Sequence, residues 1–248
     1  MANELTDRLF WKNYWESKKD LIFVIPEKYV FKEIFDRLFK EQKINSVIEL
    51  GGFPGYYATF LKKFYQTNTT LLDYFVYPEL TQKLLQKNGL AEKDVAIIEA
   101  DLFSHQPVQK YDLVLSCGLI EHFESTKSII TQHLLYLNDG GKLLITLPNF
   151  KGVNGFVQKT FDLENYNKHN IGSMNIQLLV TIAKDLGLKN VNAYYFGGFS
   201  VWLENKQQKS TFTKAFVKTI WYAGKLLTKP FGYQSRLFSP YIVLEATK

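Results

Sequence analysis

The sequence predicts an α/β protein with a doubly wound, mostly parallel sheet. Short apolar runs typical of buried strands alternate with stretches of about ten residues that have the apolar spacing of a helix. A glycine-rich turn, Gly51-Gly52-Phe53-Pro54-Gly55, directly follows the first apolar run. Strands that alternate with helices are joined by right-handed crossovers, so the strands run parallel.

Two helices are expected before the first strand, within residues 1–43. The first has four aromatic residues at helical spacing: Phe10, Trp11, Tyr14 and Trp15. The second opens at Pro26 and carries Val30, Ile34 and Leu38 on one face. The aromatic group has two interpretations, a lid over a ligand or, as is more usual for such a stripe, part of the core.

Strands and helices alternate after residue 43. Strands are expected at 46–50, 70–73, 95–99, 112–116, 142–147, 191–196 and 241–246, and helices at 56–64, 78–87, 125–137 and 176–186. No crossover helix leads back to the last strand in the usual rhythm. We therefore expect that strand to pair antiparallel with the strand at 191–196.

Length and composition favour one globular domain, residues 1–248, of which 46% are hydrophobic. No apolar run is long enough to span a membrane, and acids and lysines occupy the place of a signal peptide, which predicts a cytoplasmic protein. The single cysteine, Cys117, excludes an intrachain disulfide and a multi-cysteine zinc site.

The net charge of +6 is concentrated in residues 205–239. This segment contains no acid and seven basic residues: Lys206, Lys209, Lys214, Lys218, Lys225, Lys229 and Arg236. The rest of the chain is nearly neutral, which argues against a nucleic acid as the partner.

Three acids follow or end neighbouring strands. Glu49 lies just before the glycine turn, Asp73 ends the second strand, and Asp101 follows the third. The turn lets the backbone approach a nucleotide-like ligand, and a carboxylate at the position of Asp73 can accept both hydroxyls of a ribose. Glu49 would repel a pyrophosphate but attract a cation. The pattern predicts an adenosine-type ligand with a positive charge, although helix capping also explains Asp73 and Asp101.

These segments resemble the class I methyltransferases that use S-adenosylmethionine, in particular the small-molecule group similar to the ubiquinone and menaquinone methyltransferases. The matching pieces lie between about residues 44 and 150 in the family's order: "VIELGGFPG", "LLDY", "EADLF", "YDLVLSCGLIEHF" and "GGKLLITLPN". One position departs from the family pattern, because Phe53 stands in place of the middle glycine.

The resemblance implies a Rossmann-like sheet with strand order 3-2-1-4-5-7-6 and an antiparallel last strand. It also implies S-adenosylmethionine as cofactor and S-adenosylhomocysteine as product. The implied cofactor residues are Glu49, Gly51, Gly52 and Gly55 for the methionine part, Asp73 for the ribose, Asp101 and Leu102 for the adenine, and Cys117 and Gly118 for the amino group.

A base is needed only where the methyl acceptor starts protonated. His122, after the fourth strand, is the first candidate, and its alternative role is to orient the loop through hydrogen bonds. In the quinone-type relatives this loop carries a further acid and can hold a divalent metal. Gly118 stands at that acid's position and leaves Glu121 and His122 alone, so no metal is expected.

The segment 150–175 follows the fifth strand and is assigned to the substrate side, with a loop expected over 163–175. His169 is a second catalytic candidate there. The predicted substrate contacts are Glu121, Phe150, Tyr166 and Asn170. The alternative is a polar turn in which Asn175 caps the next helix.

The basic segment 205–239 is predicted to contain an amphipathic helix. Its apolar stripe is Phe212, Phe216, Ile220, Ala223 and Leu227, opposite a stripe of Lys214, Lys218, Lys225 and Lys229. One interpretation is that residues 210–229 make peripheral contact with an anionic membrane, which would suit an enzyme with a lipid-linked substrate. The other is a cap packed on the sheet end with a solvated lysine face.

The function predicted is methyl transfer from S-adenosylmethionine to a small-molecule or lipid-linked acceptor. A nicotinamide-dependent oxidoreductase shares the glycine turn and ribose acid but does not predict Glu49 or Asp101. A catalytically silent cofactor-binding partner protein is the third reading. An RNA methyltransferase is disfavoured because the sequence shows no aromatic stacking platform. The acceptor, the methylated atom and the oligomeric state are left open.

Overall fold

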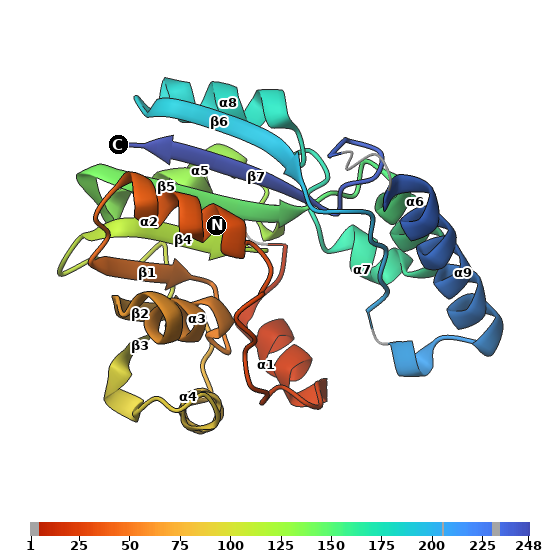
Figure 1. The fold of residues 1–248 in the computed structure, drawn as a ribbon, viewed down its shortest axis with the longest axis horizontal. Coiled ribbons are helices and arrows are strands. Elements are labelled where there is room, and N and C mark those ends of the chain that lie inside the picture. Colours follow the sequence, from red (N-terminus) through yellow and green to blue (C-terminus); the bar gives the residue numbers. More distant parts are fainter. Residues whose placement is uncertain (1–4, 205, 230–233) are drawn as a thin grey trace. The chain divides into compact units, whose positions relative to one another are not determined.

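A computed structural model describes residues 5–204, 206–229 and 234–248. Seven strands form a sheet in the order β3-β2-β1-β4-β5-β7-β6, with β7 antiparallel to its neighbours (Figure 1). The strands are β1 Ser46–Leu50, β2 Asn68–Asp73, β3 Val95–Glu99, β4 Tyr111–Cys117, β5 Leu137–Pro148, β6 Lys189–Phe196 and β7 Tyr241–Thr247. The predicted α/β class, the strand order and the antiparallel last strand are confirmed.

The helices agree with the sequence prediction in most places. They are α1 Arg8–Ser17, α2 Lys32–Glu41, α3 Tyr56–Tyr65, α4 Pro78–Lys87, α5 Thr126–Leu135, α6 Val153–Phe161, α7 Leu163–Asn167, α8 Ile176–Asp185 and α9 Thr211–Thr228. Short 3₁₀ turns lie at η1 Glu92–Asp94, η2 Ile120–His122 and η3 Lys206–Gln208.

Three expectations about these elements were wrong. Helix α2 begins at Lys32 rather than near Pro26, because Phe31 before it has a left-handed backbone (φ 68°). Strand β5 begins at Leu137, which ends the predicted helix 125–137 at Leu135. Helices α6 and α7 were not predicted, and α7 occupies part of the expected loop 163–175. Parts of the predicted segments 1–43 and 205–239, namely residues 1–4, 205 and 230–233, lie outside the described residues.

The chain divides into two compact units, which we describe separately. The β1–β4 unit comprises Asp7–Leu119, Ser128–Leu144 and Thr247–Lys248, and the β6–β7 unit comprises Met1–Thr6, Ile120–Lys127 and Ile145–Ala246. The single-domain assignment of residues 1–248 stays a prediction.

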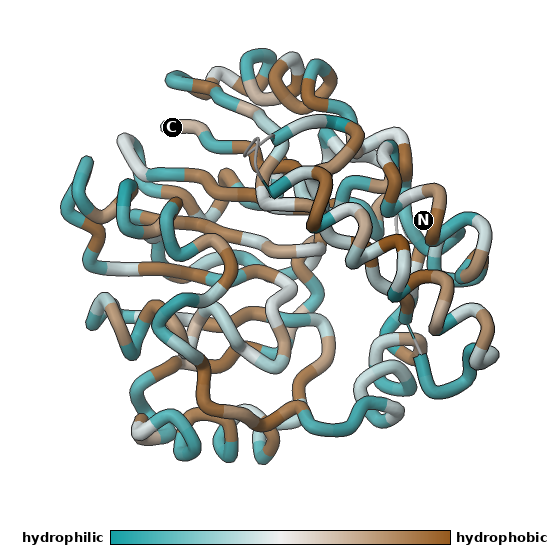
Figure 2. Tube along the Cα trace, turned by 45° about the vertical axis from the view of Figure 1, so that its right-hand side comes forward, coloured by the Kyte–Doolittle hydropathy of each residue, from teal (hydrophilic) through white to brown (hydrophobic). Residues whose placement is uncertain are grey.

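In the β1–β4 unit the strands are parallel; β1, β2 and β4 are mostly buried, whereas the edge strand β3 is largely half-exposed. Strand β1 pairs with β2 and β4, and β2 pairs with β3 in a register that sets Asp73 opposite Glu99. The strands themselves consist largely of hydrophobic residues (Figure 2), as expected where helices cover both faces of a parallel sheet. Because the strands are parallel, the segments that follow them leave from one edge.

In the β6–β7 unit helix α8 lies along β6, and helices α6 and α9 lie together (Figure 1). A buried apolar cluster joins α6, α9 and the segment after β6: Val157, Phe199, Val201, Leu203 and Val217. This cluster fixes α9 on the segment that follows β6.

Helix α9 packs through only part of the predicted apolar stripe, namely Ile220 and Phe216, whose ring lies 5.6 Å from that of Phe161. Val217 is its buried residue, and Ile220 and Trp221 pack beside it. Phe212 and Leu227 of the predicted stripe are 74% and 70% exposed. The packed face lies between the two predicted stripes, which the spacing of apolar residues alone could not reveal. Membrane contact through residues 210–229 stays a prediction, and none of the described helices has the length and hydropathy needed to cross a membrane.

Candidate functional site

The backbone and packing of the glycine turn after β1 explain each of its three glycines. Gly51 and Gly55 have φ angles of 64° and 96°, a region that side chains disfavour. Gly52 is required because a Cβ there would overlap the carboxyl group of Glu49. The bare backbone therefore accommodates a neighbouring carboxyl group as well as any ligand.

Glu49 is buried under this turn and is 1% exposed. Its Oε2 accepts a hydrogen bond of 2.7 Å from the backbone N–H of Ala58, in the first turn of α3. Burial, with a smaller contribution from the nearby Asp73, raises the pKa of the Glu49 carboxyl to about 8 although the hydrogen bond from Ala58 opposes this shift. Glu49 thus holds the turn against α3, and its contact with a ligand stays a prediction.

Asp73 ends β2 and bridges two loops through backbone hydrogen bonds. Its Oδ2 accepts from Phe53 N–H at 2.9 Å and its Oδ1 accepts from Phe75 N–H at 3.1 Å. Burial nevertheless raises the pKa of this carboxyl to about 6. Each carboxylate oxygen has a second lone pair, so the geometry leaves acceptor capacity for two hydroxyl groups.

The other predicted cofactor residues follow β3 and β4. Asp101 is half-buried, and its Oδ1 accepts from Phe103 N–H at 2.9 Å within a turn; in the described chain no helix follows β3 before β4, so Asp101 does not cap one. Leu102 is buried. Cys117 is the last residue of β4, and Gly118 follows with φ 77°. All nine predicted cofactor residues lie in the β1–β4 unit, at or after the carboxyl ends of four adjacent strands.

Helix α1 packs beside the glycine turn. The ring of Trp15 lies 5.1 Å from that of Phe53, the residue that departs from the family pattern. Arg8 Nε donates to the carbonyl of Tyr74 at 3.3 Å, and its guanidinium pairs with Glu99. The aromatic residues of α1 are only half-buried, so their interpretation as core is wrong. Arg8 was missed because its partners are distant in sequence, and the lid role stays a prediction.

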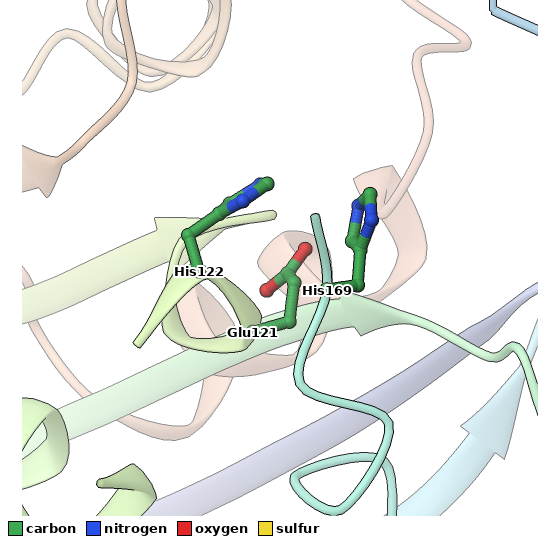
Figure 3. Close-up of side chains that lie close together, drawn as sticks. All are labelled: Glu121, His122 and His169. Atoms are coloured by element: carbon green, nitrogen blue, oxygen red, sulfur yellow. The ribbon is translucent and has the colours of Figure 1, made fainter. Parts of the chain in front are cut away.

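A cluster of Glu121, His122 and His169 lies in the β6–β7 unit (Figure 3). Glu121 and His122 come from η2, and His169 follows α7. Their potential ligand atoms lie within 4.8 Å of one another, and the two imidazole rings are 4.8 Å apart. The two predicted catalytic histidines are therefore neighbours, which the sequence did not predict.

Backbone carbonyls orient both imidazole rings. His122 Nδ1 lies 3.1 Å from the carbonyl oxygen of Lys168, and His169 Nδ1 lies 2.7 Å from that of Asn165. Because a carbonyl only accepts, Nδ1 carries the proton in each ring and Nε2 carries the lone pair. Burial lowers the pKa of His122 to about 3 and also lowers that of His169. Both rings are thus neutral near pH 7.

Glu121 is 1% exposed, and its Oε2 has no hydrogen-bond partner among the described residues. Burial raises the pKa of this carboxyl to about 8. Chemically, the cluster can accept a proton at Nε2 of either histidine or offer three donor atoms to a divalent metal. The sequence pattern indicated two donors because His169 is remote from the loop in sequence.

Phe150 lies between this cluster and Trp202, a residue that the sequence did not single out. Its ring lies 4.8 Å from His169, 6.0 Å from Tyr166 and 6.1 Å from Trp202. The spacing of Val153, Val157 and Phe161 is a sequence signal for α6, the helix whose Gln158 bonds to the backbone of Trp202.

Asn170 has a structural role. Its Nδ2 donates to the carbonyls of Phe123 and Glu124 at 3.0 and 2.9 Å, and its N–H donates to Glu121 O at 2.6 Å. Asn175 caps α8 through bonds from Gln177 and Leu178, as the alternative for this segment stated. Asn170 thus fixes the loop that carries Glu121, and its contact with substrate stays a prediction.

Comparison with family models supplies the family. Residues 25–193 match the model described as a methyltransferase domain, a range that runs from before α2 into β6. The chain belongs to this methyltransferase family. The match includes the glycine turn, the acids at the strand ends and the Glu121, His122 and His169 cluster of the methyltransferase domain. No curated protein sequence matches the chain.

Solved structures share the fold of this methyltransferase domain. Haemonchus contortus phosphoethanolamine N-methyltransferase 2, in complex with S-adenosyl-L-methionine, has a TM-score of 0.58 at 14% identity, over 87% of this chain and 51% of its own. A Bacillus halodurans putative methyltransferase has a TM-score of 0.56 at 14% sequence identity, over 87% of this chain and 99% of its own. The plantazolicin methyltransferase BpumL, solved with S-adenosylhomocysteine (SAH), has a TM-score of 0.52 at 17% sequence identity, over 87% of this chain and 81% of its own.

The chain spans about half the length of the Haemonchus enzyme, 51%. At identities of 14% to 17% these likenesses show the fold alone.

Proposed function

We propose that the protein transfers a methyl group from S-adenosylmethionine to a small-molecule or lipid-linked acceptor. The observation that carries this proposal is Asp73, a buried carboxyl at the end of β2 beside the glycine turn of a methyltransferase domain. Its remaining lone pairs suit the two hydroxyls of a ribose, as in other doubly wound sheets that bind nucleosides. The solved neighbours with bound S-adenosylmethionine or its product support the same cofactor.

In the proposed reaction a lone pair on the acceptor attacks the sulfonium methyl carbon, and the electrons of the S–CH₃ bond remain on sulfur. The products are the methylated acceptor and S-adenosylhomocysteine. The β1–β4 unit binds the cofactor, and alignment in a site without water supplies most of the rate enhancement. An acceptor that starts protonated gives its proton to Nε2 of His169, or to that of His122, whose pKa of about 3 makes it the weaker base.

The cofactor proposal is tested by calorimetry. S-adenosylmethionine and S-adenosylhomocysteine are titrated into the full chain, with NADH as the competing ligand. Heat with the first two and none with NADH supports the proposal. Tight binding of NADH alone would assign the oxidoreductase function instead.

Transfer is tested by release of S-adenosylhomocysteine from a panel of acceptors. The panel includes phosphoethanolamine, because one structural neighbour is named for it, and amphiphilic quinols, because of the resemblance to quinone methyltransferases. Cofactor binding without turnover on any acceptor would favour a silent partner protein.

A second candidate role for the same cluster is metal binding, favoured by the third donor, His169. It predicts that transfer stops after dialysis against EDTA and returns with a divalent metal. Proton acceptance by histidine predicts transfer that EDTA leaves unchanged.

A further inference from the structure

A groove in the β6–β7 unit lies between α9 and the segment that follows β6. Its volume is about 360 Å³, within the range of small-molecule sites. Val201, Leu203 and Val217 line it and belong to the buried apolar cluster. The aromatic residues Trp202, Trp221 and Tyr222 also line it. An apolar ligand can therefore bury surface against both the cluster and flat rings.

Three lysines line the same groove: Lys206, Lys214 and Lys218. No acidic residue lines it, and none forms an ion pair with these lysines in the part of the chain that the structure describes. The neighbouring Lys209 differs, because its Nζ pairs with the buried Asp162 at 2.6 Å. Lys214 and Lys218 are one helical turn apart on α9 and so carry their charges on one side. The groove thus combines an apolar lining with uncompensated positive charge.

Buried polar side chains of α6 hold the groove wall. Gln158 Nε2 donates to the carbonyl of Trp202 at 2.7 Å, and Asn154 Oδ1 accepts from its N–H at 3.3 Å. Gln158 is fully buried and Asn154 nearly so. Their hydrogen bonds fix the backbone of Trp202, so this wall is formed before any ligand arrives.

Two paths connect this wall to the Glu121, His122 and His169 cluster. Phe150 stands between the rings of Trp202 and His169, with which it makes the contacts given above. In the second path, Gln158 Oε1 accepts from Asn165 Nδ2 at 2.9 Å, and the carbonyl of Asn165 meets His169 Nδ1 at 2.7 Å. A ligand on Trp202 is therefore one aromatic ring away from the predicted catalytic histidine.

We propose that this groove binds an anionic amphiphile, a molecule with an apolar chain or ring and a phosphate or carboxylate group. The apolar part packs on Trp202, Trp221 and Val217, and the anion is held by Lys214 and Lys218. As the class of the methyl acceptor, this rests on the proposed function. Binding itself does not require the cofactor.

The test uses decyl phosphate below its micelle concentration and follows the tryptophan fluorescence of the full chain without cofactor. We expect a saturable change, because Trp202 and Trp221 line the groove. K214Q/K218Q should weaken binding roughly tenfold, since each lysine contributes a charge-assisted contact. The control, K184Q/K189Q, removes the same charge from exposed positions of the same unit that do not line the groove, and should retain the wild-type Kd.

Control ligands separate the sources of binding. Decanol lacks the anion and inorganic phosphate lacks the chain, so both should bind at least tenfold more weakly than decyl phosphate. Equal binding of decanol and decyl phosphate, or an equal loss in the two lysine pairs, would overturn the proposal. So would binding to anionic phosphatidylglycerol vesicles without any binding of monomeric decyl phosphate, which would assign α9 to a membrane surface.

Calorimetry with S-adenosylmethionine is run on the same samples. Binding of decyl phosphate without binding of the cofactor would contradict the proposed function and support the groove site. Binding of the cofactor without binding of decyl phosphate would contradict the groove site alone.

Discussion

The carboxyl group of Glu49 occupies the space that a side chain on residue 52 would need. A Cβ on Gly52 would overlap Cγ, Cδ and Oε1 of Glu49, whose Oε2 holds the N–H of Ala58 at 2.7 Å. The glycine turn and the start of α3 are thus tied together through one buried carboxyl. Any side chain at residue 52 must displace it.

The variant Gly52→Ala should therefore lower both the free energy of unfolding and the affinity for S-adenosylmethionine. Overpacking a filled site costs about 1–3 kcal/mol, and displacement of Glu49 also removes the acceptor of Ala58 N–H. Urea unfolding and calorimetry measure the two losses. Gly198→Ala is the control, because a Cβ there meets nothing within 4 Å. Equal stability of the two variants would contradict the packing seen at Gly52.

The affinity for S-adenosylmethionine should rise between about pH 5 and 7. Burial raises the pKa of Asp73 to about 6, so its carboxyl is protonated in the empty site at pH 5. Ribose hydroxyls bind best to the ionised form, so binding releases a proton at low pH. Calorimetry in two buffers of different ionisation enthalpy counts that proton. Asp73→Asn should bind weakly and without this pH dependence; a proton release that survives in this variant would assign it to another group.

Asp73 should contribute the opposite trend to the stability of the empty protein. An acid whose pKa is raised by folding stabilises the folded state most below its unfolded value near pH 4, and this stability is lost as pH rises through the folded pKa. For Asp73 the loss is on the order of 3 kcal/mol, complete near pH 7, and Glu49, with a pKa of about 8, extends the decline. Urea unfolding of the wild type and of Asp73→Asn from pH 4 to 8 measures it as the difference between the two curves, because buried His122 and His133 make stability rise with pH up to about 6.5 in both proteins. A saturating ligand that binds the carboxylates should flatten the curve.

The ion pair of Asp162 with Lys209 should stabilise the segment that leads into α9. Asp162 is 6% exposed, and its second oxygen accepts from Glu204 N–H at 2.7 Å. Asp162→Ala leaves Lys209 and that N–H without their acceptor and should cost about 3 kcal/mol of unfolding free energy.

Asp139→Ala is the matched control for this ion pair. Asp139 pairs with Lys248 at 3.6 Å but is 93% exposed, so its loss should change stability by less than about 0.5 kcal/mol. A similar loss in both variants would show that burial of Asp162 adds nothing.

The sequence predicted the β1–β4 unit well because its signals are local. Apolar runs, the glycine turn and the acids at strand ends each lie within a few residues, and parallel pairing brings them to one edge of the sheet. The role of Glu49 was harder to predict, since its burial depends on how Gly52 and Ala58 fold around it. A charge argument assigned it to a ligand, whereas its hydrogen bond serves the turn.

The β6–β7 unit was less predictable because its key contacts are long-range. The meeting of His169 with His122, and the Phe150 contact with Trp202, join segments that lie far apart in sequence. Helix α9 was predicted, but three faces of one helix carry apolar, aromatic or basic residues. That Val217 is the buried residue follows from its long-range neighbours in the apolar cluster, among them Phe199 and Leu203.

The two histidines should affect transfer more than cofactor binding. His122→Asn and His169→Asn remove an Nε2 lone pair in the β6–β7 unit, whereas all predicted cofactor residues lie in the β1–β4 unit. With a protonated acceptor from the panel, loss of the proton acceptor should lower kcat at least about 100-fold. The affinity for S-adenosylmethionine should stay within about twofold, a change of less than about 0.5 kcal/mol.

Glu164→Gln, on the exposed face of α7, controls for substitution near the cluster and should retain activity. Which histidine takes the proton follows from the larger loss of the two. If both variants transfer methyl at the wild-type rate, the acceptor needs no base, and the cluster serves the structure of the loop. If both lose cofactor affinity in parallel with rate, the histidines act through folding, because a residue that only accepts the acceptor's proton has no effect on cofactor binding.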